Sequence, residues 1–308
     1  MSAKLKSKTK LRRFTKVYIA AGYQNVIRKK MESKYKMKNE LYDKALNFVV
    51  ENGGAKFSNE ALQKYLVPEK HREKPPSINR LYQSLLESAQ NVQMSPNVIG
   101  KAISGIKGNI EPLGNFLFQF SPIEVIRHYG EITPETLFLK ILPTLKVAPN
   151  PEKRTLWFRY CKTILSSARF LSNFGGHDEF YKFTDQYYED KRIRPFLPML
   201  LSYEIDGIGF ALSCDFLKEL GYVQYGKPDT HIKDIFIELG LLNSASKQSS
   251  KADYLSLKII DEIAEINGVT PYAVDKILWL VCSGNYYLDG VEIGNQKKKF
   301  ISHMKGEA

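Results

Sequence analysis

The turn Asp206-Gly207-Ile208-Gly209 constrains the fold of this 308-residue chain more than any other feature. It separates two stretches whose apolar residues recur at helical spacing, which predicts a helix, a tight hairpin and a second helix. Glycine allows a positive φ and lets bare backbone N–H groups approach a ligand, so the second helix could begin on a phosphate or on a cation bound to a phosphate. The alternative is that the glycines only turn the chain. The apolar positions are Leu197, Leu200, Leu201 and Ile205 before the turn, and Phe210, Leu212, Phe216, Leu217 and Leu220 after it.

A second signal follows the hairpin at short range. Gly221 is expected to end the second helix, and Lys227-Pro228-Asp229-Thr230-His231 leads into another helical pattern. Asp229 stands where a helix N-cap is expected, because its side chain can accept a hydrogen bond from the first helical turn. By itself such an aspartate is a helix cap, and His231 is expected to pack or to hydrogen-bond locally.

Together the hairpin and this aspartate resemble the signature of the helix-hairpin-helix DNA glycosylases related to endonuclease III. Those proteins carry a Pro-Gly-Val-Gly type of hairpin followed by a Val-Asp-Thr-His segment. Upstream, Ser84 to Asn91 is similar to their Leu-Leu-Ser-Ala-Gln segment, whose glutamine fills the gap left by a flipped-out base. The resemblance spans roughly residues 78–236. It implies a catalytic carboxylate at Asp229 and DNA contacts at Gly207, Ile208, Gly209, Gln90, Asn91 and Lys227.

Two departures from that family change the expected chemistry. Members that cleave the DNA strand carry a Schiff-base lysine two residues after the second hairpin glycine, where this chain has Ala211. A monofunctional enzyme is therefore expected, with Lys218 and Lys227 left open as substitute amines. Many relatives also bind a four-iron cluster through closely spaced cysteines, whereas Cys161, Cys214 and Cys282 are far apart in sequence, so no iron–sulfur cluster is expected.

The resemblance implies that a base is flipped into a pocket and that a carboxylate stabilises positive charge growing on the deoxyribose as the N-glycosidic bond lengthens. Candidate pocket residues are Ala211, Tyr203 and Phe210, although aromatic residues at such spacing are more often core. No metal site is expected, apart from the option of a monovalent cation at the hairpin.

The net charge is concentrated at one end. Residues 1–38 contain 13 of the 45 lysines and arginines but only one of the 33 acidic residues, so this segment holds the whole net charge of +12. Aromatic and aliphatic residues within it predict a short helix with a basic rim. A solvated tail is one interpretation, and an arm that contacts DNA phosphates is the other.

The remaining chain predicts an all-α fold. Three segments show helical spacing, and five Ser, Thr or Asn residues each precede a proline, which marks helix starts. The family's architecture implies two helical domains with the active site between them. The expected boundaries are a basic arm over 1–38, a discontinuous helical domain over 39–76 and 224–308, and an inserted bundle over 77–223. The five starts are Ser95-Pro96, Ser121-Pro122, Thr133-Pro134, Asn150-Pro151 and Thr270-Pro271.

Composition indicates the cellular compartment in which the protein is expected. No apolar run reaches the ~18 residues of a membrane span, and three separated cysteines suit a reducing compartment. We expect a soluble, cytoplasmic protein with double-stranded DNA as partner, associated with the nucleoid if the source is prokaryotic. The oligomeric state is open, with a monomer favoured. Three functions stay open: a repair glycosylase, a defence glycosylase against hypermodified invading DNA, and a non-catalytic DNA-binding protein.

Overall fold

The computed structural model describes residues 3–53, 59–67, 74–90, 98–149, 154–286, 291–292 and 294–307. The fold in these ranges is built almost entirely from helices, which confirms the all-α prediction. The exception is one antiparallel pair of two-residue strands, with Asn285 opposite Glu292 and Tyr286 opposite Val291, where the sequence shows no alternating pattern. The α-helices are α1 Ala3–Gly53, α2 Asn59–Leu66, α3 Ile78–Ala89, α4 Val98–Ser104, α5 Pro122–Tyr129, α6 Pro134–Ile141, α7 Arg154–Leu171, α8 His177–Glu189, α9 Phe196–Glu204, α10 Phe210–Glu219, α11 Thr230–Glu238, α12 Ser250–Asn267, α13 Pro271–Ser283 and α14 Lys297–Lys305. The shorter elements are the 3-10 helices η2 Glu111–Asn115, η3 Leu142–Thr144 and η5 Ser244–Ser246, and the strands β1 Asn285–Tyr286 and β2 Val291–Glu292.

Local capping explains where several helices begin. The side chains of Ser121, Thr133 and Thr270 each accept a hydrogen bond from a backbone N–H in the first turn of α5, α6 and α13, and each is followed by proline. These three predicted starts are confirmed. Proline fits there because the first N–H groups of a helix have no intrahelical partner. The starts predicted at Ser95-Pro96 and Asn150-Pro151 lie outside the described residues.

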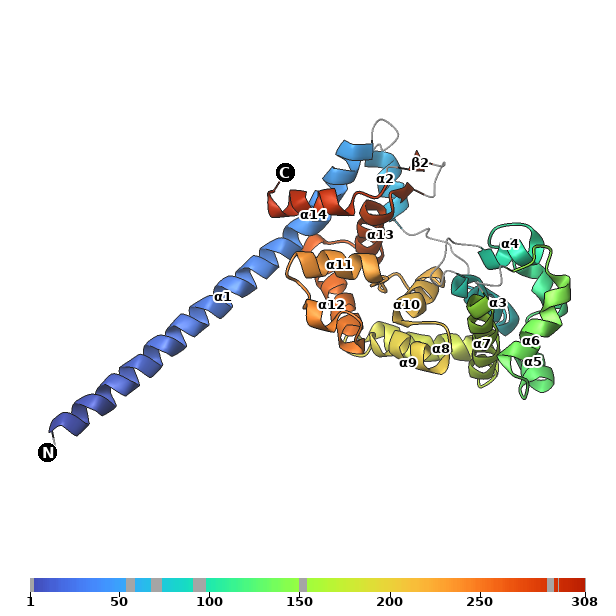
Figure 1. Cartoon of the computed structure of the whole chain (residues 1–308), viewed down its shortest axis with the longest axis horizontal. Helices are drawn as coiled ribbons and strands as arrows, with labels where there is room; N and C mark the ends of the chain where they lie inside the picture. The colour runs from blue at the N-terminus through green and yellow to red at the C-terminus, as the bar shows by residue number, and fades with distance from the viewer. Residues whose placement is uncertain are drawn as a thin grey trace.

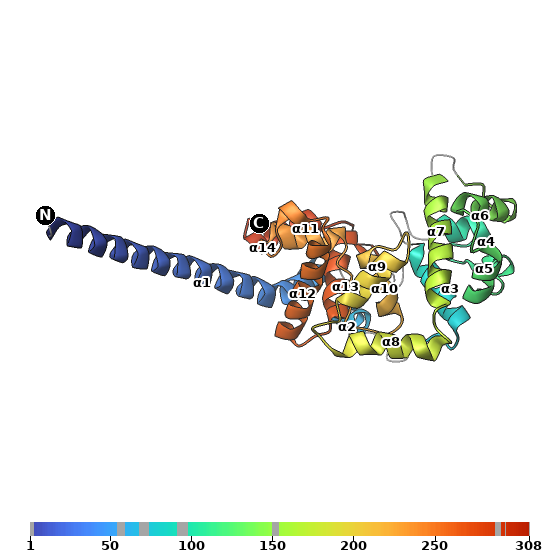
Figure 2. The same ribbon diagram turned by 90° about the horizontal axis from the view of Figure 1, so that it is seen from below.

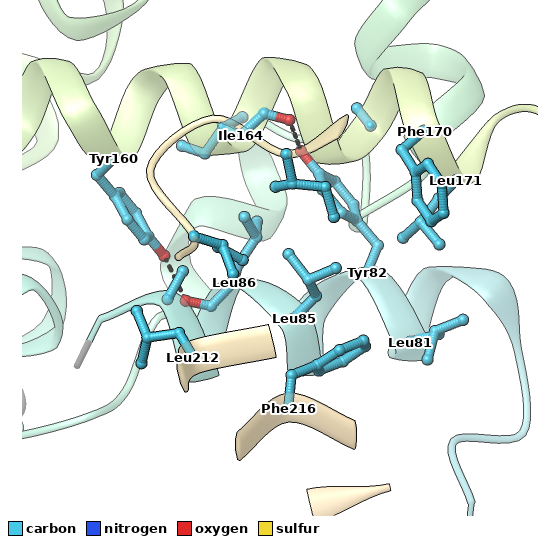
Figure 3. Close-up of a cluster of buried hydrophobic side chains, with 14 of the residues drawn as sticks. Leu81, Tyr82, Leu85, Leu86, Tyr160, Ile164, Phe170, Leu171, Leu212 and Phe216 are labelled. Carbon is cyan, nitrogen blue, oxygen red and sulfur yellow. Dashed lines mark hydrogen bonds between the residues drawn. The ribbon is translucent and has the colours of Figure 1, made fainter. Parts of the chain in front are cut away.

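Buried apolar side chains form two separate cores. One gathers residues between Leu81 and Tyr225 together with Leu257, and the other gathers residues 41–66 with residues 232–304. In the first core, Tyr82 and Tyr160 are nearly fully buried between α3 and α7 (Figure 3). Their hydroxyl groups donate to the carbonyls of Ile164, at 2.7 Å, and Leu86, at 3.2 Å (Figure 3). The predicted discontinuous domain and its boundaries remain a prediction.

The basic segment belongs to a single long helix. Helix α1 runs over 51 residues without a break at residue 38, in place of the short helix that the sequence predicts. Its C-terminal part packs into the second core through Leu41, Ala45, Phe48 and Val49. Figures 1 and 2 show its N-terminal part extending away from the rest of the molecule. None of the helices in the described ranges is long and apolar enough to cross a lipid bilayer.

Candidate functional site

The predicted hairpin is present between α9 and α10, and α7 holds it in place. The hydroxyl of Thr163 donates to the carbonyl of Asp206 at 2.7 Å, and the N–H of Asp206 donates to the hydroxyl of Ser166 at 3.0 Å. Thr163 and Ser166 therefore fix the turn, although sequence reasoning did not single them out. They lie 43 and 40 residues from Asp206, so the hairpin motif alone contains no signal for them.

The two hairpin glycines have different reasons to be glycine. Gly207 has φ +82°, and a Cβ there would lie 2.4 Å from the Thr163 hydroxyl oxygen. Gly209 has φ −86° and needs no left-handed conformation, which corrects the expectation that both glycines use positive φ. A Cβ on Gly209 would meet no atom within 4 Å, so its surroundings are open.

Helix α10 begins directly after this open position. Gly209 is its N-cap and provides no side-chain acceptor for the first N–H groups. Ile208, by contrast, is buried, so its side chain anchors the turn and only its backbone is placed for an outside partner. Because Gly209 offers no side-chain acceptor and the space beside it is open, the start of α10 suits an anion.

Asp229 is the N-cap of α11, as the sequence predicts. Its Oδ1 accepts a hydrogen bond from the N–H of Ile232 at 3.1 Å, and the side chain is half-buried. Burial raises the pKa of the Asp229 carboxyl, against the lowering effect of that hydrogen bond. The negative charge of Asp275 raises it further, whereas the charges of Lys227 and His231 lower it. The result is a carboxyl group whose pKa lies above its usual value.

A buried network of four charged side chains links α10, α13 and the segment before Asp229. Lys218 Nζ contacts Asp215 Oδ1 at 2.8 Å and Asp275 Oδ2 at 2.6 Å, and Lys227 Nζ contacts Asp215 Oδ2 at 2.7 Å. Burial opposes the charged form of each lysine, but the carboxylates outweigh it and raise the pKa of Lys218 and of Lys227. Burial likewise opposes ionisation of Asp215, yet the two ammonium groups hold its pKa well below the usual value.

This network changes two expectations about lysines. The side chain of Lys227 is 19% exposed and its ammonium is engaged by Asp215, so the structure does not present it as a free contact for DNA. Neither Lys218 nor Lys227 is a good substitute amine, because imine formation requires an unprotonated nitrogen and both are stabilised as cations.

Lys276 is a further lysine that sequence reasoning missed. Its Nζ lies 5.3 Å from the ring centre of Tyr65 and 5.5 Å from that of Tyr272. Burial lowers its pKa, and the charge of Lys218 lowers it further. Among the described residues no carboxylate forms an ion pair with it. The sequence signal that could have identified Lys276 is its position next to Asp275 in a helix that is otherwise mostly apolar.

Gln90 does not occupy the position expected of a residue that enters DNA. Its side chain is 3% exposed, its Nε2 donates to the carbonyl of Gly108 at 3.0 Å, and its Oε1 accepts from the N–H of Gly100 at 3.0 Å. Both ends of the amide thus hold the segment after α3 in place. Filling a gap in a duplex would require breaking both bonds, so Gln90 has a structural role in this structure and its contact with DNA stays a prediction. Asn91 lies outside the described residues.

The three pocket candidates differ in how much of each side chain is exposed. Phe210 is 6% exposed and belongs to the first core, whereas Tyr203 is 75% exposed on α9 and its hydroxyl lies 3.3 Å from that of Ser250. Ala211 is partly exposed in the first turn of α10 and stays a candidate. Phe210 is therefore a core residue, whereas Tyr203 is a surface residue.

Histidine, cysteine and carboxylate side chains are potential metal ligands, and cysteines are also potential nucleophiles. No group of three or more His, Cys, Asp or Glu side chains in the described parts of the chain could hold a metal ion. The three cysteines are buried, and burial raises the pKa of Cys161 and of Cys282 to about 12 and raises that of Cys214 well above its usual value. They therefore serve as packing groups, since a thiolate is the reactive form.

Comparison with known proteins gives a partial match. No family model matches this sequence. An 81-residue stretch is 30% identical to the 8-oxoguanine DNA glycosylase/AP lyase of Korarchaeum cryptofilum (strain OPF8) and covers 26% of this chain and 39% of that protein. This chain resembles a DNA glycosylase. Because the match covers 39% of the relative, it compares only part of the two proteins.

A solved structure is also similar, at lower identity. It is the crystal structure of Methanocaldococcus jannaschii 8-oxoguanine glycosylase/lyase in complex with a 15mer DNA containing 8-oxoguanine. The alignment covers 78% of this chain and 96% of that chain, with 16% sequence identity and a TM-score of 0.45.

Proposed function

We propose that this protein is a DNA N-glycosylase that flips a damaged base out of duplex DNA and hydrolyses its N-glycosidic bond. The observation that carries the proposal is the half-buried carboxyl of Asp229, held at the start of α11 and linked by a buried charge network to the helix that follows the hairpin. The hairpin supplies an open, uncapped helix start suited to a phosphate. The partial match to a DNA glycosylase supports the same activity.

The chemistry follows from the demands of the bond. As the base leaves, positive charge develops on the deoxyribose, and a carboxylate held beside it stabilises that charge or activates the attacking water. Placing the carboxylate in a site of reduced solvent access strengthens the interaction, since less water screens it. Asp229 fits this role because its position is fixed by capping and its surroundings are partly dry.

Water is the proposed nucleophile in the base-release step. Ala211 has no amine, and the ammonium groups of Lys218 and Lys227 are bound by carboxylates. Base release is therefore monofunctional in this proposal and leaves an abasic site. The first base to test is 8-oxoguanine, which is the base named for the matched relative.

The Asp229→Asn variant tests the proposal. Asparagine is nearly isosteric and still caps the helix, so folding and duplex binding are expected to be retained while base release falls on the order of a hundredfold or more. The assay uses duplexes that carry 8-oxoguanine or a panel of mismatched and hypermodified bases, with abasic sites revealed by hot alkali. Equal rates for the variant and the wild type would remove Asp229 from the mechanism. Binding without release of any base would favour the non-catalytic alternative.

Omitting alkali tests the monofunctional step. Intact strands are expected, because no amine at position 211 can form an imine with the sugar. Strand breaks, with a covalent complex trapped by borohydride, would contradict it. Loss of that complex in Lys276→Ala but not in Lys258→Ala would identify Lys276 as the amine. Lys258 is the matched control because its Nζ also lies over a tyrosine ring, 5.7 Å from the centre of Tyr254.

A further inference from the structure

The buried charge network reaches Asp229 through the chain itself. The N–H of Asp229 donates to the carbonyl of Lys227 at 2.8 Å, and Lys227 Nζ contacts Asp215 Oδ2 on α10 at 2.7 Å. On its other side Asp229 caps α11 through Ile232. The short segment that carries Asp229 is thereby attached to α10 at one end and to α11 at the other.

A second branch of the network ends on α13. Lys218 Nζ joins Asp215 on α10 to Asp275 on α13, whose side chain is 2% exposed. Two lysines and two aspartates alternate along the network, so each buried charge has an opposite neighbour. Removal of one member leaves the network with a net buried charge, which is costly in the interior.

We propose that Lys227 and Asp275 are positioning residues that hold Asp229 in place and bias its charge in opposite directions, Lys227 favouring the carboxylate and Asp275 opposing it. The role in catalysis rests on the function proposed above, whereas the effect on the charge of Asp229 does not. The network attaches the segment that carries Asp229 to α10 and α13, and its two end members, Lys227 and Asp275, carry opposite charges.

The charged groups around Asp229 come from each element packed near it. Burial is the largest influence and raises its pKa, Asp275 on α13 adds to that effect, and Lys227 and His231 lower the pKa. Cys282, also on α13, is close enough for the charge of Asp229 to contribute to the raised pKa of that thiol. Because these groups are buried or half-buried, salt screens their charges little, and a neutral substitution at Lys227 or at Asp275 removes one charge from the surroundings of Asp229.

The test is a titration of the Asp229 carboxyl by carbon-13 NMR in the full chain without DNA. Asp275→Asn removes a negative charge and leaves Lys218 less compensated, so the midpoint is expected to move to lower pH. Lys227→Met removes a positive charge at similar side-chain size, so the midpoint is expected to move to higher pH. Glu262→Gln is the control, because its partner Lys38 is on α1 and neither residue belongs to the network. Its midpoint is expected to match that of the wild type.

Lys227→Arg keeps the test decisive even where Asp275→Asn fails to fold. Arginine retains the positive charge, so its midpoint is expected to stay near the wild-type value while that of Lys227→Met rises. Equal shifts in Lys227→Met and Lys227→Arg, or shifts of Asp275→Asn and Lys227→Met in the same direction, would overturn the proposal.

Activity separates this proposal from the proposed function. With a duplex that contains 8-oxoguanine, the acid limb of the pH–rate profile for base release is expected to move with the NMR midpoint, downward for Asp275→Asn and upward for Lys227→Met. NMR midpoints that shift as expected, with no base released by the wild type from any tested duplex, would leave the network standing and reject the glycosylase. Unshifted midpoints in an active enzyme would reject the network and leave the glycosylase.

Discussion

At the scale of single residues, the protonation state of the charged residues in the candidate site depends on their surroundings. Asp229 combines a cap, partial burial and neighbours of both signs, and its role could be proposed from the sequence because a cap depends on adjacent residues. Lys227 and Gln90 could not be interpreted in the same way. Their partners, Asp215 for Lys227 and Gly100 and Gly108 for Gln90, are brought close by tertiary folding. Adjacent residues indicate the possible roles of a side chain, and contacts with residues distant in sequence determine which role it takes.

Asp261 gives a prediction on stability at this scale. It is 6% exposed on α12, its Oδ1 has no hydrogen-bond partner within the described structure, and burial raises its pKa to about 6 against the lowering charge of Arg194. Below its usual value of 3.8 the carboxyl is protonated in both the folded and the unfolded state. Between pH 3.8 and about 6 the unfolded state ionises first, so stability falls as the pH rises, and the loss is constant above that range.

Asp261→Asn is therefore expected to stabilise the protein at pH 7.5, on the order of 2–3 kcal/mol. The gain should shrink toward zero near pH 3, where the wild-type carboxyl is largely neutral in both states. Urea unfolding of both proteins across this range measures it. A gain of the same size at both ends of the range would mean that the effect comes from packing instead of ionisation.

At the scale of elements, the hairpin between α9 and α10 shows how much a motif can and cannot specify. The turn and the two flanking helices could be predicted because glycine and the apolar spacing are local signals. The clamp from Thr163 and Ser166 on α7 could not, because no spacing rule connects α7 to the turn. Helix α13 is a similar case: its apolar face predicts a core helix, and the charged network begins at the one acidic residue within it, Asp275.

The two glycines of the hairpin allow a matched pair of substitutions. Gly207→Ala is expected to destabilise the protein by about 2 kcal/mol or more, because the left-handed conformation and the contact with Thr163 both resist a Cβ. Gly209→Ala has neither problem, so its cost is limited to the weaker N-cap preference of alanine and is expected to be smaller than that of Gly207→Ala. Thermal unfolding of both variants provides the measurement. Equal destabilisation would show that the clamp is not what requires glycine at position 207.

At the scale of the whole molecule, the all-α class could be predicted from capping and periodicity, whereas the arrangement of the two cores depends on contacts between distant segments. Residues 41–66 pack with residues 232–304, and no local signal pairs them. The length of α1 also differs from the prediction, since the helix continues from the basic segment into the part that packs in the second core.

The basic segment supports a prediction on DNA binding. Residues 2–16 contain seven of the 45 lysines and arginines. If these side chains neutralise DNA phosphates, their deletion should flatten the dependence of log affinity on log salt by roughly 0.9 for each phosphate that they neutralise. Duplex affinity measured over a salt series gives the slope for the full chain and the deletion. An unchanged slope would mean that the segment is a solvated tail that does not contact DNA phosphates.

Helix α1 gives the molecule a pronounced asymmetry. A continuous helix of 51 residues is about 76 Å long, and its positive charge is concentrated in the portion that points away from the two cores (Figure 1). A duplex rises about 34 Å per turn, so such a rod laid along DNA would span about two turns. Protection from nuclease digestion would then extend much farther on one flank of the lesion than on the other, and two molecules on opposite strands would leave mirror-related footprints.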